Sequence, residues 1–430
     1  MPLDSARLAR SRFLVFGALW LTAACGSSAL EPDDTDIMED VPDELQSPRV
    51  PMSTGPLNFK AACAPGATMV LTGLGDVLLH TRLQNQAKSR DGAPENDNFD
   101  SLWHGAKDVV SAADITYANF EGPADGNRKG ASYPAFNYAP TLIPALQALG
   151  VDVVSTANNH ALDQGFGGLK STLDAMERYG MPHSGTSRGG EVESHEWNAE
   201  TNTTKDSTKF SIAWIACSFA QNSASGATNG IKDSNNAVLN CERDQDVVLK
   251  RISELASTHD AVVVTPHWGV EYELSPRLAQ TQMARAFVNA GARLVLGNHP
   301  HVPQTWERLK SNRDGRDAFV IYSMGNFISG QLPGVVKSPY TWRTLAAHVG
   351  LVRTADGLTE ISGVRFTPLY ARPRAGVVGV VPALSEAAND PLAQQVIDTA
   401  DTMYGKEHRV AVVPAAIRGT WSGSGFSCQE

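Results

Sequence analysis

The sequence predicts a mixed α/β fold, built on a mostly parallel sheet that helices cover on both sides. Two observations lead to this prediction. From Met69 onward, short apolar runs alternate with stretches of helical periodicity, and strands that alternate with helices form sheets with helices on both faces. Most of the apolar runs end in polar or glycine-rich residues, as expected of buried strands that gather ligands at their carboxyl ends.

Residues 151–165, VDVVSTANNHALDQG, show this pattern most clearly. The apolar run stops at Asn158, Asn159 and His160, and Asp163 follows three residues later. A buried strand that delivers polar side chains to its carboxyl end has this profile. Asparagine also favours turns for purely local reasons, so this stretch alone is equally consistent with a simple turn.

The other expected strands follow in chain order. They are MVLTGL before Asp76, ITYANF before Glu121, FSIAWIA before Cys217, AVVVTP before His267, RLVLG before the segment NHPH at 298–301, and AFVIYSMGNF, which ends near Asn326.

Helices are expected between these strands, and several of them close with a glycine of the kind that caps helix C-termini. Their ranges are 103–113, 142–149, 168–179, 244–257 and 278–289. The later segments 346–353 and 358–370 have strand character with no helix between them and predict an antiparallel hairpin. One further helix is expected near 391–403.

Composition and charge exclude one class of partner. The chain has 430 residues with a formal net charge of −10 and no patch dense in lysine and arginine, whereas nucleic-acid binding normally needs a basic footprint. We therefore expect no nucleic-acid partner, and any bound phosphate would be held locally, through metal ions. The composition leaves the oligomeric state open.

The amino terminus predicts an export signal. Three arginines precede the apolar run FLVFGALWLTAA, which is too short to span a bilayer. The small residues before Cys25 and the GSS after it resemble the lipobox of bacterial lipoproteins, in which this cysteine is lipidated. Thr22 departs from the pattern, which usually has leucine there, and ordinary cleavage near Ala24 is the alternative.

Four sections of the chain are expected. Residues 1–25 read as a lipoprotein signal peptide and 26–58 as a disordered acidic and proline-rich tether. Residues 59–372 form the folded domain, and 373–430 form a C-terminal extension packed on it. The protein would then be exported, on the periplasmic or cell-surface face, and would meet the membrane through its lipid anchor only.

The remaining cysteines are Cys63, Cys217, Cys241 and Cys428. No CxxC pair occurs, which argues against a zinc ribbon, and disulfides persist outside the cytoplasm. Of the three possible connectivities we favour Cys217–Cys241, which closes a polar loop, with Cys63–Cys428, which ties the start of the domain to its end.

The residues at the strand ends include two carboxylates, an amide and several imidazoles: Asp76, Glu121, Asn159, His160, His267, His299 and His301. Each has an ordinary structural explanation by itself, but together they suit one or two divalent transition ions such as Mn, Fe or Zn. In the HPH segment the two imidazoles would alternate along an extended backbone, stiffened by Pro300. Such a pair can serve two adjacent ions, as in enzymes that hydrolyse phosphate esters and some amides.

Six motifs, in this order, resemble the signature series of the CapA family, the poly-γ-glutamate capsule-synthesis proteins: GDVLLH, NFEGP, ANNHALDQG, HWGVEY, GNHPHVPQ and YSMGNF. The resemblance covers roughly residues 69–370. This family is in turn similar to the calcineurin-like metallophosphatases. The resemblance implies a four-layer α/β/β/α sandwich of the calcineurin-like metallophosphatase type, with a metal centre at one edge of its two sheets.

The resemblance also implies a role for each motif residue. Asp76 and His301 would hold the first ion, Glu121 would bridge both ions, and the second ion would be held by Asn159, His267 and His299. His160 would protonate the leaving group, and Asp163 would orient it. The phosphatases have a histidine two residues after their first aspartate, whereas here His80 comes only at the fourth position, and their bridging residue is aspartate rather than glutamate.

Substrate-binding candidates lie in two of the motifs. Trp268, Glu271 and Tyr272 in HWGVEY are candidates for lining a substrate groove, with packing at its rim as the alternative. Asn326 is a further candidate, with the shaping of a turn as its alternative.

Two functions remain open. The first is an exported metallohydrolase that cleaves a phosphoester or a γ-glutamyl amide with metal-activated water, His160 acting as the acid. The second is a capsule-assembly factor that binds an anionic polymer such as poly-γ-glutamate without turnover. A purely structural surface lipoprotein is disfavoured, because it would not need converging metal-type ligands.

Overall fold

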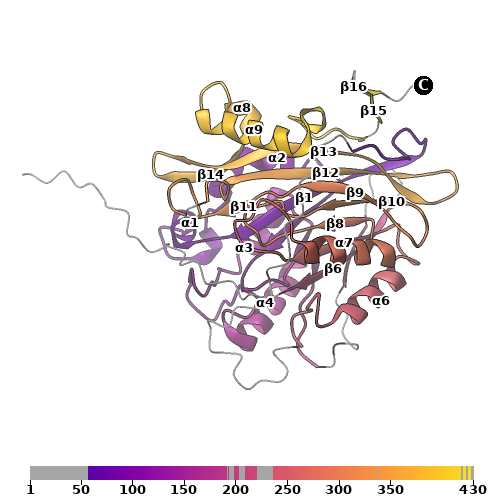
Figure 1. The fold of residues 1–430 in the computed structure, drawn as a ribbon. Helices are drawn as coiled ribbons and strands as arrows, with labels where there is room; N and C mark the ends of the chain where they lie inside the picture. Colours follow the sequence, from indigo (N-terminus) through magenta and orange to yellow (C-terminus); the bar gives the residue numbers. More distant parts are fainter. Residues whose placement is uncertain are drawn as a thin grey trace, which may run out of the picture.

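A computed structural model describes residues 57–190, 192, 198–202, 209–219, 236–336, 338–417, 420–422 and 425–427. Two large β-sheets pack face to face, and helices cover the outer face of each sheet (Figure 1). The expected signal peptide with Cys25 and almost all of the acidic tether lie outside the described residues. None of the described helices combines the length and the apolar character needed to cross a membrane.

The first sheet has the strand order β14-β13-β12-β1-β2-β3-β4, and β11 pairs with β1. Strands β1, β2, β3, β4 and β11 are parallel to their neighbours in this group, whereas β12, β13 and β14 are antiparallel. Their bounds are β1 Ala67–Leu78, β2 Ile115–Phe120, β3 Val153–Ser155, β4 His183–Ser184, β11 Asn326–Ser329, β12 Arg343–Arg353, β13 Thr359–Arg374 and β14 Val377–Pro382. The expected late antiparallel hairpin is confirmed as β12 and β13.

The second sheet has the order β5-β6-β7-β8-β10-β9. Its four middle strands are parallel, and β5 and β9 are antiparallel edge strands. Their bounds are β5 Asn198–Asn202, β6 Ser211–Ser218, β7 Ala261–His267, β8 Leu294–Leu296, β9 Trp306–Lys310 and β10 Asp317–Ile321. A short hairpin near the carboxyl terminus pairs β15 Thr420–Ser422 with β16 Gly425–Ser427.

The inner faces of the two sheets share one apolar core. Leu71 and Tyr117 of the first sheet and Trp214 and Leu296 of the second belong to it, and Tyr117 stacks on Trp214 with ring centroids 5.5 Å apart. Separate cores form where helices pack on the outer face of each sheet. The four-layer α/β/β/α arrangement implied by the resemblance is therefore confirmed.

The helices on the first sheet include α1 Thr81–Ala87, α2 Lys107–Val110, α3 Leu142–Leu149, α4 Gly165–Tyr179, α8 Ala383–Glu386 and α9 Pro391–Tyr404, and those on the second are α6 Gln245–Leu255 and α7 Leu278–Ala290. Helix α3 buries Leu142, Ile143, Leu146 and Leu149, which is the spacing of one helix face. The helix expected over 103–113 is shorter than predicted, because a 3-10 turn, His104–Ala106, precedes the four residues of α2.

Two expected boundaries are wrong. The single strand expected over 318–327 is divided: β10 belongs to the second sheet and β11 to the first. The chain crosses between the sheets through Gly325, whose φ of 71° is a left-handed conformation that glycine adopts without strain. The domain boundary expected at 373 falls inside β13, and the chain beyond it adds β14 to the same sheet.

A disulfide joins Cys217, in β6, to Cys241, with their Cα atoms 5.1 Å apart. Cys63 is also disulfide-bonded. Cys428 lies outside the described residues, so the pairing of Cys63 with Cys428 stays a prediction.

Candidate metal centre

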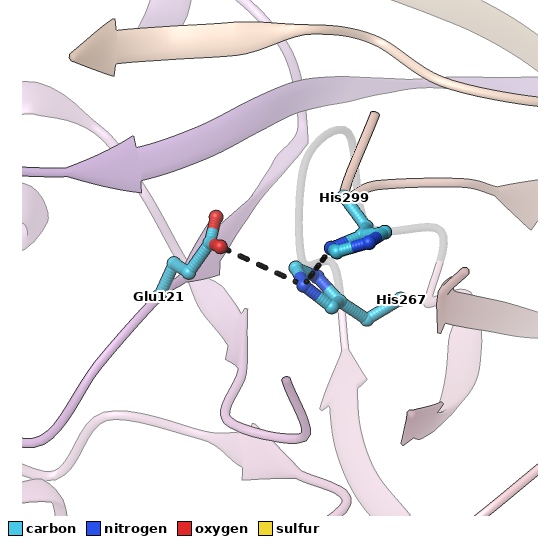
Figure 2. A group of neighbouring side chains, drawn as sticks. All are labelled: Glu121, His267 and His299. Atoms are coloured by element: carbon cyan, nitrogen blue, oxygen red, sulfur yellow. Dashed lines mark hydrogen bonds and ion pairs between the residues drawn. The ribbon is translucent and has the colours of Figure 1, made fainter. Parts of the chain in front are cut away.

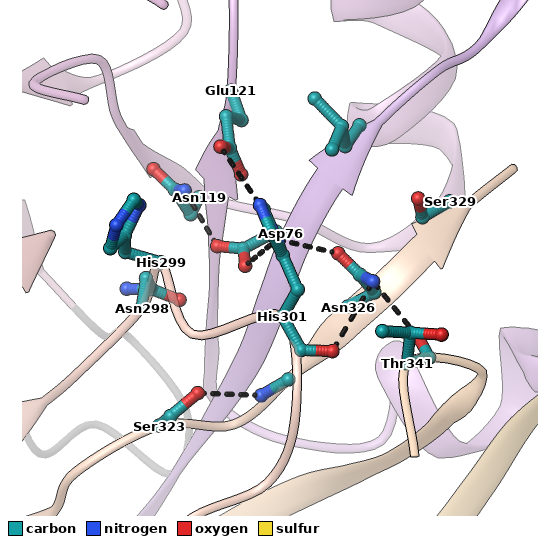
Figure 3. A network of polar contacts seen from close by, with 12 residues as sticks. Asp76, Asn119, Glu121, Asn298, His299, His301, Ser323, Asn326, Ser329 and Thr341 are labelled. Atoms are coloured by element: carbon teal, nitrogen blue, oxygen red, sulfur yellow. Dashed lines mark hydrogen bonds and ion pairs between the residues drawn. The ribbon is translucent and has the colours of Figure 1, made fainter. Parts of the chain in front are cut away.

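The polar residues that end the strands meet where the carboxyl ends of the two sheets come together. Asp76 lies in β1 and Glu121 directly follows β2, whereas His267 ends β7 and the HPH segment follows β8. Donor atoms of these residues form groups within 4.8 Å of one another. Side chains from both sheets therefore build one centre (Figure 3).

Glu121, His267 and His299 form the first of these groups, which we call the histidine group. Nε2 of His267 lies 3.0 Å from Nδ1 of His299 and 3.6 Å from Oε1 of Glu121 (Figure 2). The same nitrogen lies 2.9 Å from Oδ1 of Asn159. One ring nitrogen donates at most one proton, so hydrogen bonding does not account for all three approaches. Tetrahedral donors at about 2.1 Å from one zinc ion lie about 3.4 Å apart, and the separations of 2.9, 3.0 and 3.6 Å lie close to this spacing.

Asp76, Glu121 and His301 form a second group, the carboxylate group (Figure 3). Nδ1 of His301 lies 3.1 Å from Oδ2 of Asp76 and 3.0 Å from Oδ1 of Asn326, and its Nε2 lies 3.8 Å from Oε1 of Glu121. Glu121 belongs to both groups. It therefore occupies the position of a residue that bridges two ions.

The environment of Glu121 is the strongest indication that a cation binds at this centre. Its side chain is fully buried, and neither carboxylate oxygen has a hydrogen-bond partner among the described residues. A buried carboxylate is stable only when it is paired with a cation, bound to a metal or protonated. The chemistry of the surrounding donors, carboxylate, amide and imidazole, fits one or two divalent metal ions.

The histidines of the two groups differ in charge when no ion is bound. Burial opposes a charge on His301, but the carboxylates of Glu121 and Asp76 outweigh it and raise the pKa of His301 to about 10. Burial lowers the pKa of His299 to about 4, and burial together with the neighbouring His299 and His301 lowers the pKa of His267 well below its usual value. Neutral imidazole is the form that binds a metal, so His267 and His299 are ready to coordinate.

The HPH segment is not extended, and the expectation of an extended backbone is wrong. His299 and His301 have φ angles of 97° and 57°, in a region that residues with a side chain seldom occupy. Such a conformation costs about 1–3 kcal/mol for each residue and is typical of functional sites. It directs His299 toward His267 and His301 toward Asp76.

His160 lies beside the centre without belonging to either donor group. Its Nδ1 is 2.7 Å from Oδ2 of Asp163. The same carboxylate oxygen accepts a hydrogen bond from the backbone N–H of Phe136 at 2.7 Å, and the Phe136 ring packs edge-on against His160 at 4.8 Å. Asp163 and Phe136 therefore fix the orientation of the imidazole.

Comparison with known proteins identifies the family. The family model described as "Bacterial capsule synthesis protein PGA_cap" matches residues 70–331. The chain belongs to the PGA_cap family. The match contains both donor groups and the His160–Asp163 pair.

Curated relatives agree with this assignment. The PGA biosynthesis protein CapA of Bacillus subtilis is 28% identical over 245 residues, which cover 55% of this chain and 59% of the relative. The capsule biosynthesis protein CapA of Bacillus anthracis is 25% identical over 273 residues, which cover 61% of this chain and 60% of the relative. The matches thus span about three fifths of the length of these relatives.

Solved structures with a similar fold include phosphatases and nucleotidases. A phosphatase of Mycoplasma pneumoniae matches with a TM-score of 0.39 and 13% identity, covering 77% of this chain and 98% of that one. The NAD nucleotidase of Haemophilus influenzae matches with a TM-score of 0.42 and 10% identity, covering 82% of this chain and 65% of that one.

Two of the residues predicted to bind substrate in this PGA_cap protein, Trp268 and Asn326, are buried. Trp268 is fully buried, its Nε1 donates to the backbone carbonyl of Tyr322 at 2.8 Å, and its ring packs against the helix-covered core of the second sheet. Asn326 is buried as well, with Oδ1 near His301 and Nδ2 donating to Gln331 and Thr341. Neither side chain lines a groove, because all of these contacts lie inside the protein.

Tyr272 and Glu271 lie closer to the centre. The Tyr272 ring is 6.2 Å from that of His301, and its hydroxyl accepts a hydrogen bond from Gln331. Glu271 is partly buried, and its carboxylate forms a third donor group with His299 and His301. Burial favours its neutral form, but His301 and His299 outweigh burial and lower the pKa of Glu271.

The sequence analysis missed one residue of the centre and left His80 unassigned. Asn119 donates to Oδ1 of Asp76 at 2.7 Å and accepts from the hydroxyl of Ser155. Its position two residues before Glu121 was a usable signal, because alternate residues of a strand share a face. His80 is not part of a donor group, and its Nδ1 accepts from the N–H of Gly330 at 3.1 Å.

Proposed function

We propose that this PGA_cap protein is an exported, metal-dependent hydrolase of capsule or poly-γ-glutamate biosynthesis that cleaves a phosphoester or a γ-glutamyl amide. The observation that carries the proposal is the His160–Asp163 pair, held 2.7 Å apart and next in the chain to Asn159, whose Oδ1 lies 2.9 Å from Nε2 of His267. A protein that only bound an anionic polymer through metal ions would not need an oriented imidazole next to them.

In this mechanism the chain positions the reacting groups and moves one proton. The donor groups would hold one or two divalent ions, which polarise the scissile group and activate water. Asp163 accepts a hydrogen bond from Nδ1 of His160 and so holds the ring with Nε2 free to act on the substrate. The leaving oxygen or nitrogen then takes the proton from Nε2 of His160, so that the bond breaks without forming an unstable anion.

A non-catalytic role in capsule assembly is the second candidate. The names of the Bacillus relatives refer to PGA and capsule biosynthesis rather than to a reaction. Divalent ions at the same donor groups would neutralise the carboxylates of an anionic polymer as readily as a phosphate.

His160→Ala separates the two candidates. General acid catalysis typically contributes about 10²–10⁴ in rate, so the variant should lose at least about a hundredfold in turnover of phosphomonoesters, phosphodiesters or γ-glutamyl amides. It should keep its metal content, because His160 is in neither donor group. Asp163→Asn should lose less, since it disturbs only the orientation of the ring.

The hydrolase proposal fails if the metal-loaded wild type turns over none of these substrates, or if His160→Ala supports polymer assembly as well as the wild type does. Either result favours the binding role.

We also propose that the protein is a lipoprotein anchored through Cys25, because a charged and apolar leader ends in small residues before it. Cys25→Ser should then move the protein from the membrane fraction to the soluble fraction. A variant that stays in the membrane fraction would contradict the anchor, as would a soluble wild type.

A further inference from the structure

The loop after β7 brings a third carboxylate to the centre. Glu271 belongs to the segment HWGVEY, and its carboxylate lies within 4.8 Å of donor nitrogens of both His299 and His301. Each of these histidines also belongs to one of the two groups that contain Glu121. Glu271 therefore lies next to both donor groups through the two histidines.

The loop is fixed at both of its ends, so the position of Glu271 is built into the fold. On one side, Trp268 is buried in the core of the second sheet. Gly269 follows with a φ of 89°, and a Cβ there would lie 2.7 Å from the side chain of Gln280. On the other side, the backbone N–H of Tyr272 donates to the carbonyl of Pro300 at 2.8 Å. The loop is thus bonded directly to the HPH segment.

Tyr272 is itself in the left-handed region, with a φ of 65°. His299 and His301 have positive φ angles as well, so three residues other than glycine are strained. They lie in two segments, the HWGVEY loop and the HPH segment, that contact each other. Strain of this kind persists only where surrounding contacts enforce it, and it clusters where ligands bind.

Within the described structure, histidines rather than lysine or arginine lie beside the carboxylate of Glu271. Among the described residues no lysine or arginine forms an ion pair with Glu271, whereas Glu273, two residues further along the same loop, pairs with Arg277. The neighbours of Glu271 are the imidazoles of His299 and His301, each of which belongs to a donor group. A divalent cation would satisfy both the carboxylate and these imidazoles.

The carboxylate group by itself offers three residues, Asp76, Glu121 and His301, whereas a zinc ion commonly takes four ligands. We propose that Glu271 supplies a further ligand to the metal centre, at the ion held by His301, rather than contacting the substrate. This proposal rests on the proposed metal-dependent function and completes the donor set of that site.

The test is metal binding by the full-length chain, measured by elemental analysis and by calorimetric titration with Mn²⁺ and Zn²⁺. Glu271→Gln should bind one ion fewer than the wild type, or should hold one ion at least about 10–100-fold more weakly. Glu273→Gln, whose carboxylate pairs with Arg277, is the matched control and should bind as the wild type does. Glu271→Asp keeps a carboxylate and should recover part of the lost affinity.

Co²⁺ substitution gives a second readout that a merely structural role would not change. The visible absorption bands of bound Co²⁺ report its ligand set, so Glu271→Gln should alter them and Glu273→Gln should not. Unchanged stoichiometry, affinity and Co²⁺ spectrum in Glu271→Gln would overturn the proposal and leave the metal centre intact. A wild type that binds no ion would overturn both this proposal and the proposed function.

Discussion

Glu121 illustrates at the scale of one residue how function and stability conflict. Its carboxylate is fully buried without a hydrogen-bond partner among the described residues. Burial and the nearby Asp76 raise the pKa of Glu121, which means that the ionised form is destabilised as long as no cation is bound. The residue therefore costs stability in the metal-free protein and recovers it when a divalent ion binds.

Glu121→Gln should separate these two effects. Because the substitution removes the buried charge and keeps the shape, the metal-free variant should be at least as stable as the metal-free wild type. Addition of Mn²⁺ at about a hundred times its Kd should stabilise the wild type by about 2.7 kcal/mol and should not stabilise the variant. Thermal unfolding with and without Mn²⁺ measures both effects.

Glu254→Gln, at a half-exposed carboxylate on α6, is the control and should behave like the wild type in both conditions. A Glu121→Gln variant that still gains stability from Mn²⁺ would show that Glu121 is not a ligand.

Sequence analysis located the donor residues well but not the residues that support them. Asp76, Glu121 and His267 follow or end apolar runs, and this information is local to each strand. The position of Asn326 beside His301 depends on contacts between segments that are separated in the sequence, and so does the burial of Trp268. The left-handed backbone of His299 and His301 was not expected either, because neither residue is glycine.

At the scale of elements, β12 contains a buried polar residue with a measurable consequence. His348 is fully buried between the hydroxyl groups of Thr72, at 2.8 Å, and Thr367, at 3.0 Å. Burial lowers the pKa of His348 to about 3, whereas an unfolded histidine titrates near 6.5. Between these two values the unfolded chain binds the extra proton, so the stability contributed by neutral His348 is present above about pH 6.5 and is lost as the pH falls.

We therefore predict that His348→Gln flattens the pH dependence of stability. The glutamine amide can still bond to both threonines and does not titrate. Between about pH 6 and pH 4 the wild type should lose about 1.4 kcal/mol more per pH unit than the variant, and above about pH 7 the two slopes should agree. Urea unfolding at several pH values gives these slopes, and parallel slopes below pH 6 would contradict the prediction.

Helices and strands were predictable where the pattern of residues within one segment determines them. The predictions failed where packing between distant segments determines which sheet a strand joins. The alternation in 346–353 and 358–370 correctly predicted two antiparallel strands, β12 and β13. In the run 318–327, Ser323 and Gly325 interrupt the apolar residues, but this break alone does not indicate that β10 and β11 belong to different sheets. The division follows from the crossover at Gly325, whose carbonyl accepts from the backbone N–H of Asp76.

At the scale of the whole molecule, the centre exists because two sheets end at the same place. The first sheet supplies Asp76 and Glu121, and the second supplies His267 and the HPH segment. Strand order along the chain predicts an α/β fold, but it does not show that two sheets pack face to face. The four layers were expected only from the resemblance of the six motifs to a known family, and the described structure confirms them.

The central claim is that both sheets together hold divalent ions, and the metal content of a double variant tests it most directly. The experiment compares three full-length proteins: the wild type, the double variant His299→Ala/His301→Ala, and the control His104→Ala at an exposed position. Each is loaded with Mn²⁺ or Zn²⁺ and freed of excess metal, and its metal content is measured by elemental analysis. We predict one or two ions per chain in the wild type and the control, and none in the double variant with its circular dichroism spectrum preserved. A folded double variant with the metal content of the wild type would contradict the assignment of the centre.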